Sequence, residues 1–384
     1  MQKNHIDIWL MVAVLGLMVI SLGVVYSASA EWAYARYENQ NHYIDLHAIK
    51  ILLSIGALFA GLSIPYRVYK KLAKPALIIA IAFLAVTLLL GGETKGAVRW
   101  LHYGGLGFQP SEFAKFTLLF YLCALLTVKG ETIRDLKKGF IPAMVWVGIV
   151  TLLVMLQPNF STAAMIIILS IMILFVGGVR FSHLTATMGC LIPVLAGYVL
   201  IAPYRLQRMK LFMQSRTNGR ANYQLWQGMI GFGNGGIFGV GPGESRQRDL
   251  FLPESYNDFV YSIIGEEYGF IGAVFILAVF LFIMIRGYKI AKNAKDDFGR
   301  YLAIAITGTI TLYAVVNACV ALGIFPTTGL PMPFISYGGS ALLMTAFGAG
   351  VLLNISAYTD MHPRIVKAGT AMEPPPSAEL GKAY

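Results

Sequence analysis

Apolar runs of about twenty residues recur along this chain, and short polar segments separate them. Each run is long enough to cross the hydrocarbon core of a bilayer, where a helix satisfies its own backbone hydrogen bonds. The pattern therefore predicts an all-α, polytopic membrane protein with about ten transmembrane helices. The expected spans cover residues 8–30, 46–64, 75–92, 110–128, 139–157, 161–178, 185–203, 259–285, 301–325 and 339–358.

Basic residues indicate the orientation of these spans, because short cytoplasmic loops of membrane proteins collect Lys and Arg. Eighteen of the thirty basic residues fall on the side that holds the N-terminus. Three lie in short segments on the other side and seven in one long loop, while Lys50 and Lys115 lie within spans. We therefore expect residues 1–360 to form one ten-helix domain with both termini in the cytoplasm. Residues 361–384, which include three consecutive prolines, are expected to form a disordered cytoplasmic tail.

The composition supports a membrane protein, because 57% of the residues are hydrophobic and 13% are charged. No soluble catalytic domain is predicted, so any chemistry has to use loops and the outer halves of helices. Cys123, Cys190 and Cys319 are isolated within apolar runs, which indicates neither a disulfide framework nor a metal site.

The loop at residues 204–258 is the exception to the short connections. It is much longer than a connector requires, and its aromatic residues and glycines argue against plain disorder. Its net positive charge suits a phosphate-bearing ligand, although a solvated loop attracted to anionic lipid headgroups is the alternative. Its basic residues are Arg205, Arg208, Lys210, Arg216, Arg220, Arg246 and Arg248.

Asp258 stands where this loop enters the membrane, at the expected start of the eighth span. A carboxylate at this depth can reach a substrate at the headgroup level and accept a proton from a hydroxyl nucleophile. An aspartate at the start of a helix also serves as an N-cap. Position alone leaves both interpretations open.

Further charged residues are expected inside the spans. Glu266 and Glu267 lie about 12 Å deeper than Asp258 at the helical rise. Glu112 and Lys115 share one face of the fourth span, because they are three residues apart. We expect Lys115 to pair across helices with Glu266 or Glu267 as a buried structural ion pair, with direct substrate contact as the alternative.

Three other stretches have possible roles at the outer boundary. Arg99, next to Trp100, either holds a pyrophosphate or anchors at the interface, and its position favours anchoring. The glycine-rich stretch 231–243 is neither a Rossmann nor a Walker motif, and permits tight turns or close backbone approach. Residues 329–340 form irregular backbone of the kind that lines a cavity in membrane proteins.

Taken together, these motifs resemble the SEDS (shape, elongation, division and sporulation) family, the FtsW/RodA proteins, across essentially all ten spans. Residues 245–248 and 334–339 are more similar to the division branch, FtsW, than to the elongation branch, RodA. The matching stretches are 26–29, 96–100, 109–115, 223–228, 233–243, 252–259, 264–267 and 333–339.

The resemblance implies a peptidoglycan glycosyltransferase that polymerises lipid II on the outer face of the bacterial inner membrane. A sugar 4-hydroxyl would attack the anomeric carbon of the growing chain, and undecaprenyl pyrophosphate would leave with inversion. The resemblance assigns the general base to Asp258. The residues expected to contact substrate are Arg99, Glu112, Lys115, Arg205, Arg216, Gln227, Arg246, Arg248 and Glu254.

The resemblance also implies partners. These are a class B penicillin-binding protein, which supplies the transpeptidase, and other divisome membrane proteins; nucleic acid is not expected. Mg²⁺ or Mn²⁺ could help to neutralise the pyrophosphate, although the sequence offers no dedicated ligand cluster. The alternatives are a lipid II flippase, an elongation-branch polymerase and a scaffold that recruits the transpeptidase.

Overall fold

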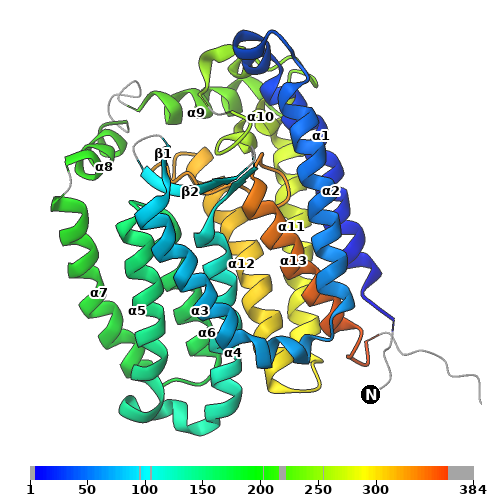
Figure 1. The fold of residues 1–384 in the computed structure, drawn as a ribbon. Coiled ribbons are helices and arrows are strands. Elements are labelled where there is room, and N and C mark those ends of the chain that lie inside the picture. The colour runs from blue at the N-terminus through cyan, green and yellow to red at the C-terminus, as the bar shows by residue number, and fades with distance from the viewer. Residues whose placement is uncertain are drawn as a thin grey trace, which may run out of the picture.

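The chain forms a bundle of long helices in a computed structural model (Figure 1). The structure describes residues 5–94, 97–103, 106–201, 203–215, 222–253 and 255–361. The predicted tail therefore lies almost entirely outside the described residues. An all-α architecture is confirmed, with a three-stranded antiparallel sheet as a small addition that was not predicted.

The elements follow one another along the chain, with single-turn helices η1, η2 and η4 at three connections. Their bounds are α1 Ile8–Tyr37, α2 His42–Ser63, α3 Tyr66–Leu90, β1 Gly92–Thr94, β2 Ala97–Tyr103, β3 Leu106–Phe108, α4 Pro110–Lys129, η1 Gly130–Arg134, η2 Leu136–Phe140, α5 Ile141–Leu156, α6 Phe160–Val176, α7 Phe181–Ile201, α8 Pro203–Ser215, α9 Tyr223–Gly235, η4 Gln247–Phe251, α10 Val260–Glu267, α11 Gly269–Lys292, α12 Asp297–Ala321 and α13 Gly339–Ser356.

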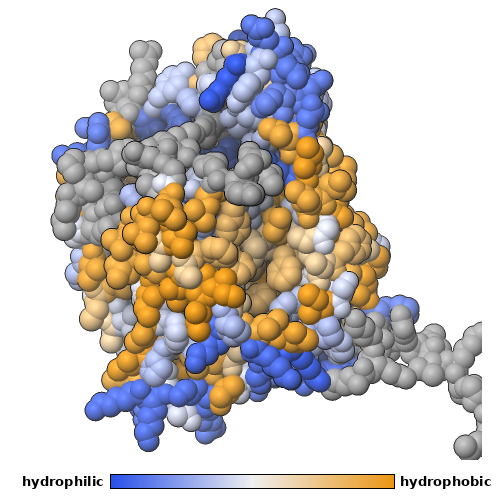
Figure 2. All heavy atoms as spheres, viewed as in Figure 1, coloured by the Kyte–Doolittle hydropathy of each residue, from blue (hydrophilic) through white to orange (hydrophobic). Residues whose placement is uncertain are grey.

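The helices of the bundle are long and apolar enough to cross a membrane. Among the described residues, eight helical segments meet this criterion, and two shorter apolar segments lie in α6 and α7. Figure 2 shows the corresponding surface, an apolar band between hydrophilic ends. The chain is thus a multi-pass membrane protein, and the total of ten spans stays a prediction.

The long loop at residues 204–258 is largely structured in its described part. It contains α8, α9 and η4, and these elements gather with the strands at the end of the bundle opposite the start of α1 (Figure 1). This arrangement covers one end of the helices with a layer of short elements. The expectation that the loop is not plain disorder is confirmed for its described residues.

The predicted eighth span, 259–285, is wrong in one respect, because it is two helices. α10 ends at Glu267 and α11 begins at Gly269, whose φ of +64° favours glycine. The glycine-rich loop fills this break: the N–H of Val240 donates to the carbonyl of Glu266 at 3.0 Å, and that of Phe270 donates to Gly236 at 2.9 Å. A Cβ on Gly239 would lie 2.1 Å from the carbonyl oxygen of Glu267, so the expected close backbone approach is confirmed here.

Polar contacts fasten the opposite end of the bundle. Asp7 caps α1 by accepting from the N–H of Leu10, and its carboxylate pairs with Arg286 of α11 at 2.7 Å. The N–H of Asp7 also donates to Ser356 at the end of α13. The fully buried Asp7 therefore joins three helices at the end that holds the start of α1, through its carboxylate to Arg286 and through its backbone N–H to Ser356.

Replacing Asp7 with alanine is expected to lower stability by about 3 kcal/mol, because it removes the buried carboxylate that pairs with the mostly buried Arg286. Thermal unfolding of the detergent-solubilised protein measures this loss. The matched control is Asp297→Ala, which breaks an exposed pair with Arg300 and is expected to change stability by about 0.5 kcal/mol or less. Equal effects of the two variants would contradict the fastening role of Asp7.

Candidate active site

Asp258 lies in the last turn before α10, with its carboxylate beside the loop that joins α12 to α13. It is half-buried, and a Cβ on Gly329 would lie 3.3 Å from its Oδ2 atom. The N-cap of α10 is Phe259, which has no side-chain capping bond. Asp258 therefore does not cap α10, and the N-cap interpretation is wrong.

Asn317 of α12 holds this arrangement in place. Its side-chain amide donates to the backbone carbonyl of Asp258 at 2.9 Å and to that of Leu330 at 2.8 Å. The side chain is buried, so both carbonyls are satisfied away from water. One amide thus fastens the loop that carries Asp258 to the loop that follows α12.

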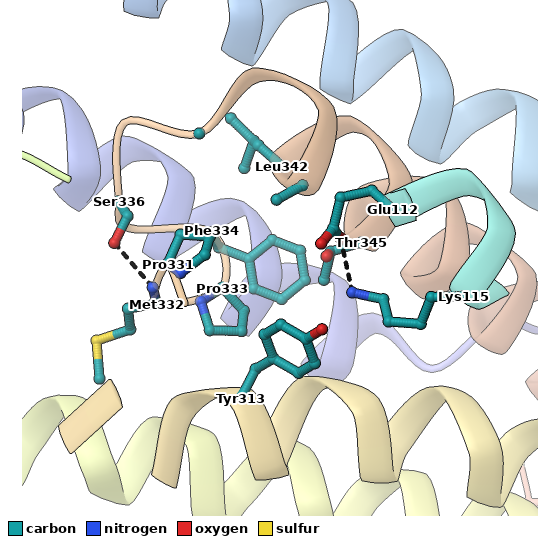
Figure 3. Close-up of a pocket in the computed structure, with 12 residues that line it drawn as sticks. Glu112, Lys115, Tyr313, Pro331, Met332, Pro333, Phe334, Ser336, Leu342 and Thr345 are labelled. Carbon is teal, nitrogen blue, oxygen red and sulfur yellow. Dashed lines mark hydrogen bonds and ion pairs between the residues drawn. The ribbon is translucent and has the colours of Figure 1, made fainter. Parts of the chain in front are cut away.

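A pocket of about 280 Å³, including its open mouth, lies under this second loop (Figure 3). Glu112 and Lys115 of α4 enter it from one side, and Tyr313 of α12 enters from another. Pro331 begins the part of the loop that lines the pocket, and it lies two residues after Gly329. The carboxylate of Asp258 is therefore positioned at the edge of the same loop.

Glu112 and Lys115 form a buried ion pair with an N···O distance of 2.6 Å. The ammonium also lies 4.0 Å from the centroid of the Tyr313 ring, a cation–π contact. The expected pairing of Lys115 with Glu266 or Glu267 is therefore wrong. α4 packs mainly against α3, α6 and α12, whereas α10 packs mainly against α1, α9 and α11, so similar depth does not bring these charges together.

Glu266 and Glu267 have a structural role of a different kind. Glu266 accepts hydrogen bonds from Ser245, from the Asn234 side chain and from the N–H of Gln247. Glu267 accepts one from Ser27 of α1. Both carboxylates are buried, and they fasten the glycine-rich loop and α1 to α10.

The loop above the pocket is irregular and strained at Phe334. This buried residue has a φ of +62°, in a region that costs a non-glycine residue about 1–3 kcal/mol. The Ser336 hydroxyl accepts from the N–H of Met332 at 2.8 Å and closes the turn. The expectation that this stretch lines a cavity is confirmed.

Aromatic side chains flank the approach to Asp258. Tyr256 stacks on Tyr43 of α2 with ring centroids 4.7 Å apart, and its carbonyl accepts from the N–H of Tyr337 at 3.0 Å. Burial, with a smaller effect of Tyr43, raises the pKa of Tyr256 above its ordinary value. The Tyr256 phenol is therefore protonated at neutral pH.

The other residues that were predicted to contact substrate do not line this pocket, as far as the structure describes them. Arg99 donates to the carbonyls of Gln157 and Pro158, which is an anchoring contact with the turn before α6. Arg248 pairs with Asp249 at 3.4 Å, and Arg246 is exposed. Gln227 is half-buried on α9, and Arg205 lies on α8. Arg216 and Glu254 lie outside the described residues.

Sequence reasoning missed Asn317 and Tyr313. They are four residues apart on α12, so they share one face of that helix. An asparagine in an otherwise apolar span was the available signal, because a buried amide needs hydrogen-bond partners. Among the described residues, no three His, Cys, Asp or Glu side chains gather as metal ligands, and no step below is routed through a metal.

Replacing Lys115 with methionine leaves Glu112 buried without its cation, and is expected to lower stability by about 3–5 kcal/mol. The double variant Lys115→Met, Glu112→Gln removes both charges and is expected to recover most of the loss. Thermal unfolding of both variants in detergent measures the difference. A double variant no more stable than the single one would refute a buried ion pair.

The chain was compared with known proteins. The family model described as "Cell cycle protein", FtsW/RodA/SpoVE, matches residues 8–361. A relative from Trichlorobacter lovleyi, named "Probable peptidoglycan glycosyltransferase FtsW", is 36% identical over 360 residues, which cover 93% of this chain and 94% of the relative. The Bacillus subtilis "Stage V sporulation protein E" is 33% identical over 361 residues, which cover 93% of this chain and 99% of that protein.

Solved structures share the fold. Thermus thermophilus rod shape determining protein RodA is 25% identical, with a TM-score of 0.67 over 91% of this chain and 96% of that one. A second similar chain belongs to the structure described as "Structural coordination of polymerization and crosslinking by a peptidoglycan synthase complex". It has a TM-score of 0.74 and is 26% identical, and the match covers 91% of this chain and 97% of that one. By family match, sequence identity and fold, the chain belongs to the FtsW/RodA/SpoVE family.

Proposed function

We propose that this protein is a peptidoglycan glycosyltransferase that polymerises lipid II on the outer face of the bacterial cytoplasmic membrane, for septal wall synthesis. The observation that carries the proposal is the position of Asp258. Its loop is held by Asn317 against the loop that lines the Glu112–Lys115 pocket. The FtsW names of the relatives support the reaction type and favour the division branch over the RodA-like branch.

The proposed reaction forms one bond and breaks another. The 4-hydroxyl of the acceptor sugar attacks the anomeric carbon of the donor, and the bond from that carbon to the pyrophosphate oxygen breaks. Asp258 accepts the hydroxyl proton, and undecaprenyl pyrophosphate leaves with the bonding electrons. Attack from the face opposite the leaving group inverts the anomeric centre.

The protein would assist this displacement electrostatically. The leaving pyrophosphate gains negative charge in the transition state, so positioned cations lower the barrier. The exposed Arg246 and the half-buried Arg248 lie in the outer loop between α9 and α10. The pair of Glu112 and Lys115 is neutral overall, so it would position polar groups in the pocket without adding net charge.

The distribution of basic residues supports an orientation in which both termini are cytoplasmic. The outer loop, the strands and the pocket then face the periplasmic or external side. A class B penicillin-binding protein is the proposed partner, because a polymerised glycan still needs a transpeptidase. The similar chain in the structure described as "Structural coordination of polymerization and crosslinking by a peptidoglycan synthase complex" supports this proposal. Other divisome membrane proteins would join the two.

A lipid II flippase is the second candidate, because family resemblance alone does not separate the two activities. A flippase needs a polar path through the whole bundle. At the end that holds the start of α1, the contacts of Asp7 with Arg286 and Ser356 close three helices together. This closure favours the polymerase.

Replacing Asp258 with alanine is expected to lower glycan polymerisation by about a hundredfold or more, because the general base is lost. The purified protein with its transpeptidase partner is given lipid II, and the glycan chains are separated on a gel. The matched control is Glu244→Ala, which removes an exposed carboxylate from the same loop and is expected to keep activity. If Asp258→Ala makes glycan chains in the same yield as the wild type, Asp258 is not the general base. If the wild type translocates lipid II but makes no glycan chains, the flippase is favoured.

Asn317 is proposed as a positioning residue, so its replacement is expected to lower kcat. Asn317→Ala removes one hydrogen bond to the backbone of Asp258, and kcat should fall by about tenfold to a hundredfold while KM for lipid II changes little. Steady-state kinetics separate the two constants. Asn293→Ala, at an exposed asparagine after α11, is the control. A rise in KM with kcat unchanged would contradict a positioning role.

A further inference from the structure

Lys50 is a cation inside the span α2 that the proposed mechanism does not use. It lies eight residues after the start of the helix, which is about 12 Å along its axis. Charged residues at such depth are costly, and each is a functional hypothesis by default. Lys115, the other lysine predicted within a span, is neutralised by Glu112.

The contacts of Lys50 differ from those of Lys115. Within the described residues, no carboxylate pairs with Lys50. Its ammonium lies 3.4 Å from the centroid of the Tyr337 ring. The electron-rich face of an aromatic ring attracts a cation, and this contact replaces only part of an anion's effect. Lys50 therefore keeps a charge that an anionic ligand can match.

The surroundings of Lys50 connect it to the candidate active site. The Tyr337 ring contacts Tyr256 at 5.6 Å between centroids, and Tyr256 is two residues before Asp258. The Lys50 side chain also lies against Gly339, where an added Cβ would be 3.7 Å from its Cε atom. Gly338, the residue before, lines the Glu112–Lys115 pocket. An anion at Lys50 would thus adjoin the proposed site.

The start of α13 adds to the positive potential. Gly339 is the first residue of this 18-residue helix, and no side chain caps it. The first N–H groups of a helix have no partner within it, and they give that end a partial positive charge. Lys50 and the α13 N-terminus therefore act on the same small volume from two helices.

Lys50 is also reachable from the lipid side of α2. Ile49 and Leu53, which lie beside it on the helix, are 53% and 50% exposed, and a bilayer would contact both. His47 and Ile51 are buried on the packed face. Lys50 is thus at the margin between lipid and protein, where a membrane lipid could place its headgroup phosphate without leaving the bilayer.

We propose that Lys50 binds the pyrophosphate of the polyprenyl-linked substrate, with the lipid chain along α2 and the sugar directed toward Asp258. This inference rests on the proposed function and adds a substrate-binding residue to it. An ammonium bonds a phosphate through charge-assisted hydrogen bonds, which are stronger than neutral ones. An ordinary phospholipid also carries a phosphate that could bind Lys50. The experiment therefore has to distinguish the polyprenyl-linked substrate from a phospholipid.

Binding is measured on the full chain in nanodiscs, without any polymerisation step. The probes are undecaprenyl pyrophosphate and, separately, phosphatidylglycerol. Lys50→Met removes the charge with little change in shape and is expected to weaken undecaprenyl pyrophosphate binding by about tenfold. Lys50→Arg should keep most of the affinity. The matched control is Lys70→Met, which makes the same change at an exposed lysine at the opposite end of the bundle and should bind as the wild type does.

Two outcomes would overturn the proposal. One is equal affinity of Lys50→Met and wild type for undecaprenyl pyrophosphate, and the other is weakened binding of phosphatidylglycerol alone, which would make Lys50 a phospholipid contact. Lys50→Gln provides a second neutral variant, and thermal unfolding confirms that each variant is folded. Because binding needs no catalysis, a wild type that binds the probe but makes no glycan would refute the polymerase and leave the Lys50 result interpretable.

Discussion

The absence of water inside a bilayer is the constraint on which this structure depends. Every polar group that enters the bundle has to find its partner within the protein. Asn317 illustrates the solution, because its single amide satisfies two backbone carbonyls and thereby joins two irregular loops. Glu112 with Lys115 and Asp7 with Arg286 solve the same problem for charges. The contacts of Asn317 and the pair of Glu112 with Lys115 assemble the candidate site.

Sequence reasoning anticipated the helical architecture, because hydropathy depends on the local composition of the chain. It also anticipated that the loop at residues 204–258 is not plain disorder, which holds for its described residues. It failed on the partner of Lys115, because depth along a helix does not reveal which helices are neighbours. It also missed the break between α10 and α11. That break depends on the backbone of Gly236, Gly239 and Gly269, which come together only in the folded chain. Asp258 could be named as a candidate but not separated from an N-cap by position.

The two membrane-embedded lysines show how similar residues acquire different roles. Lys115 is buried and matched by a carboxylate one turn away, so its charge is balanced inside the protein. Lys50 lies at the margin of the bundle against an aromatic ring. The strained backbone at Phe334 lies in the loop between them, where packing against the buried core holds an unfavourable φ. The same loop contacts Lys50 through Tyr337 and lines the pocket that Lys115 enters.

The two hydrogen bonds that Asn317 donates also limit how the chain can change in length. The Asn317 amide fixes the backbone of Asp258 relative to that of Leu330. Asn317 and Leu330 are also joined along the chain by the segment that leaves the end of α12. A residue inserted in this segment would shift the register of the pocket-lining loop against the carboxylate. The length of this segment therefore sets the distance between Asp258 and the pocket.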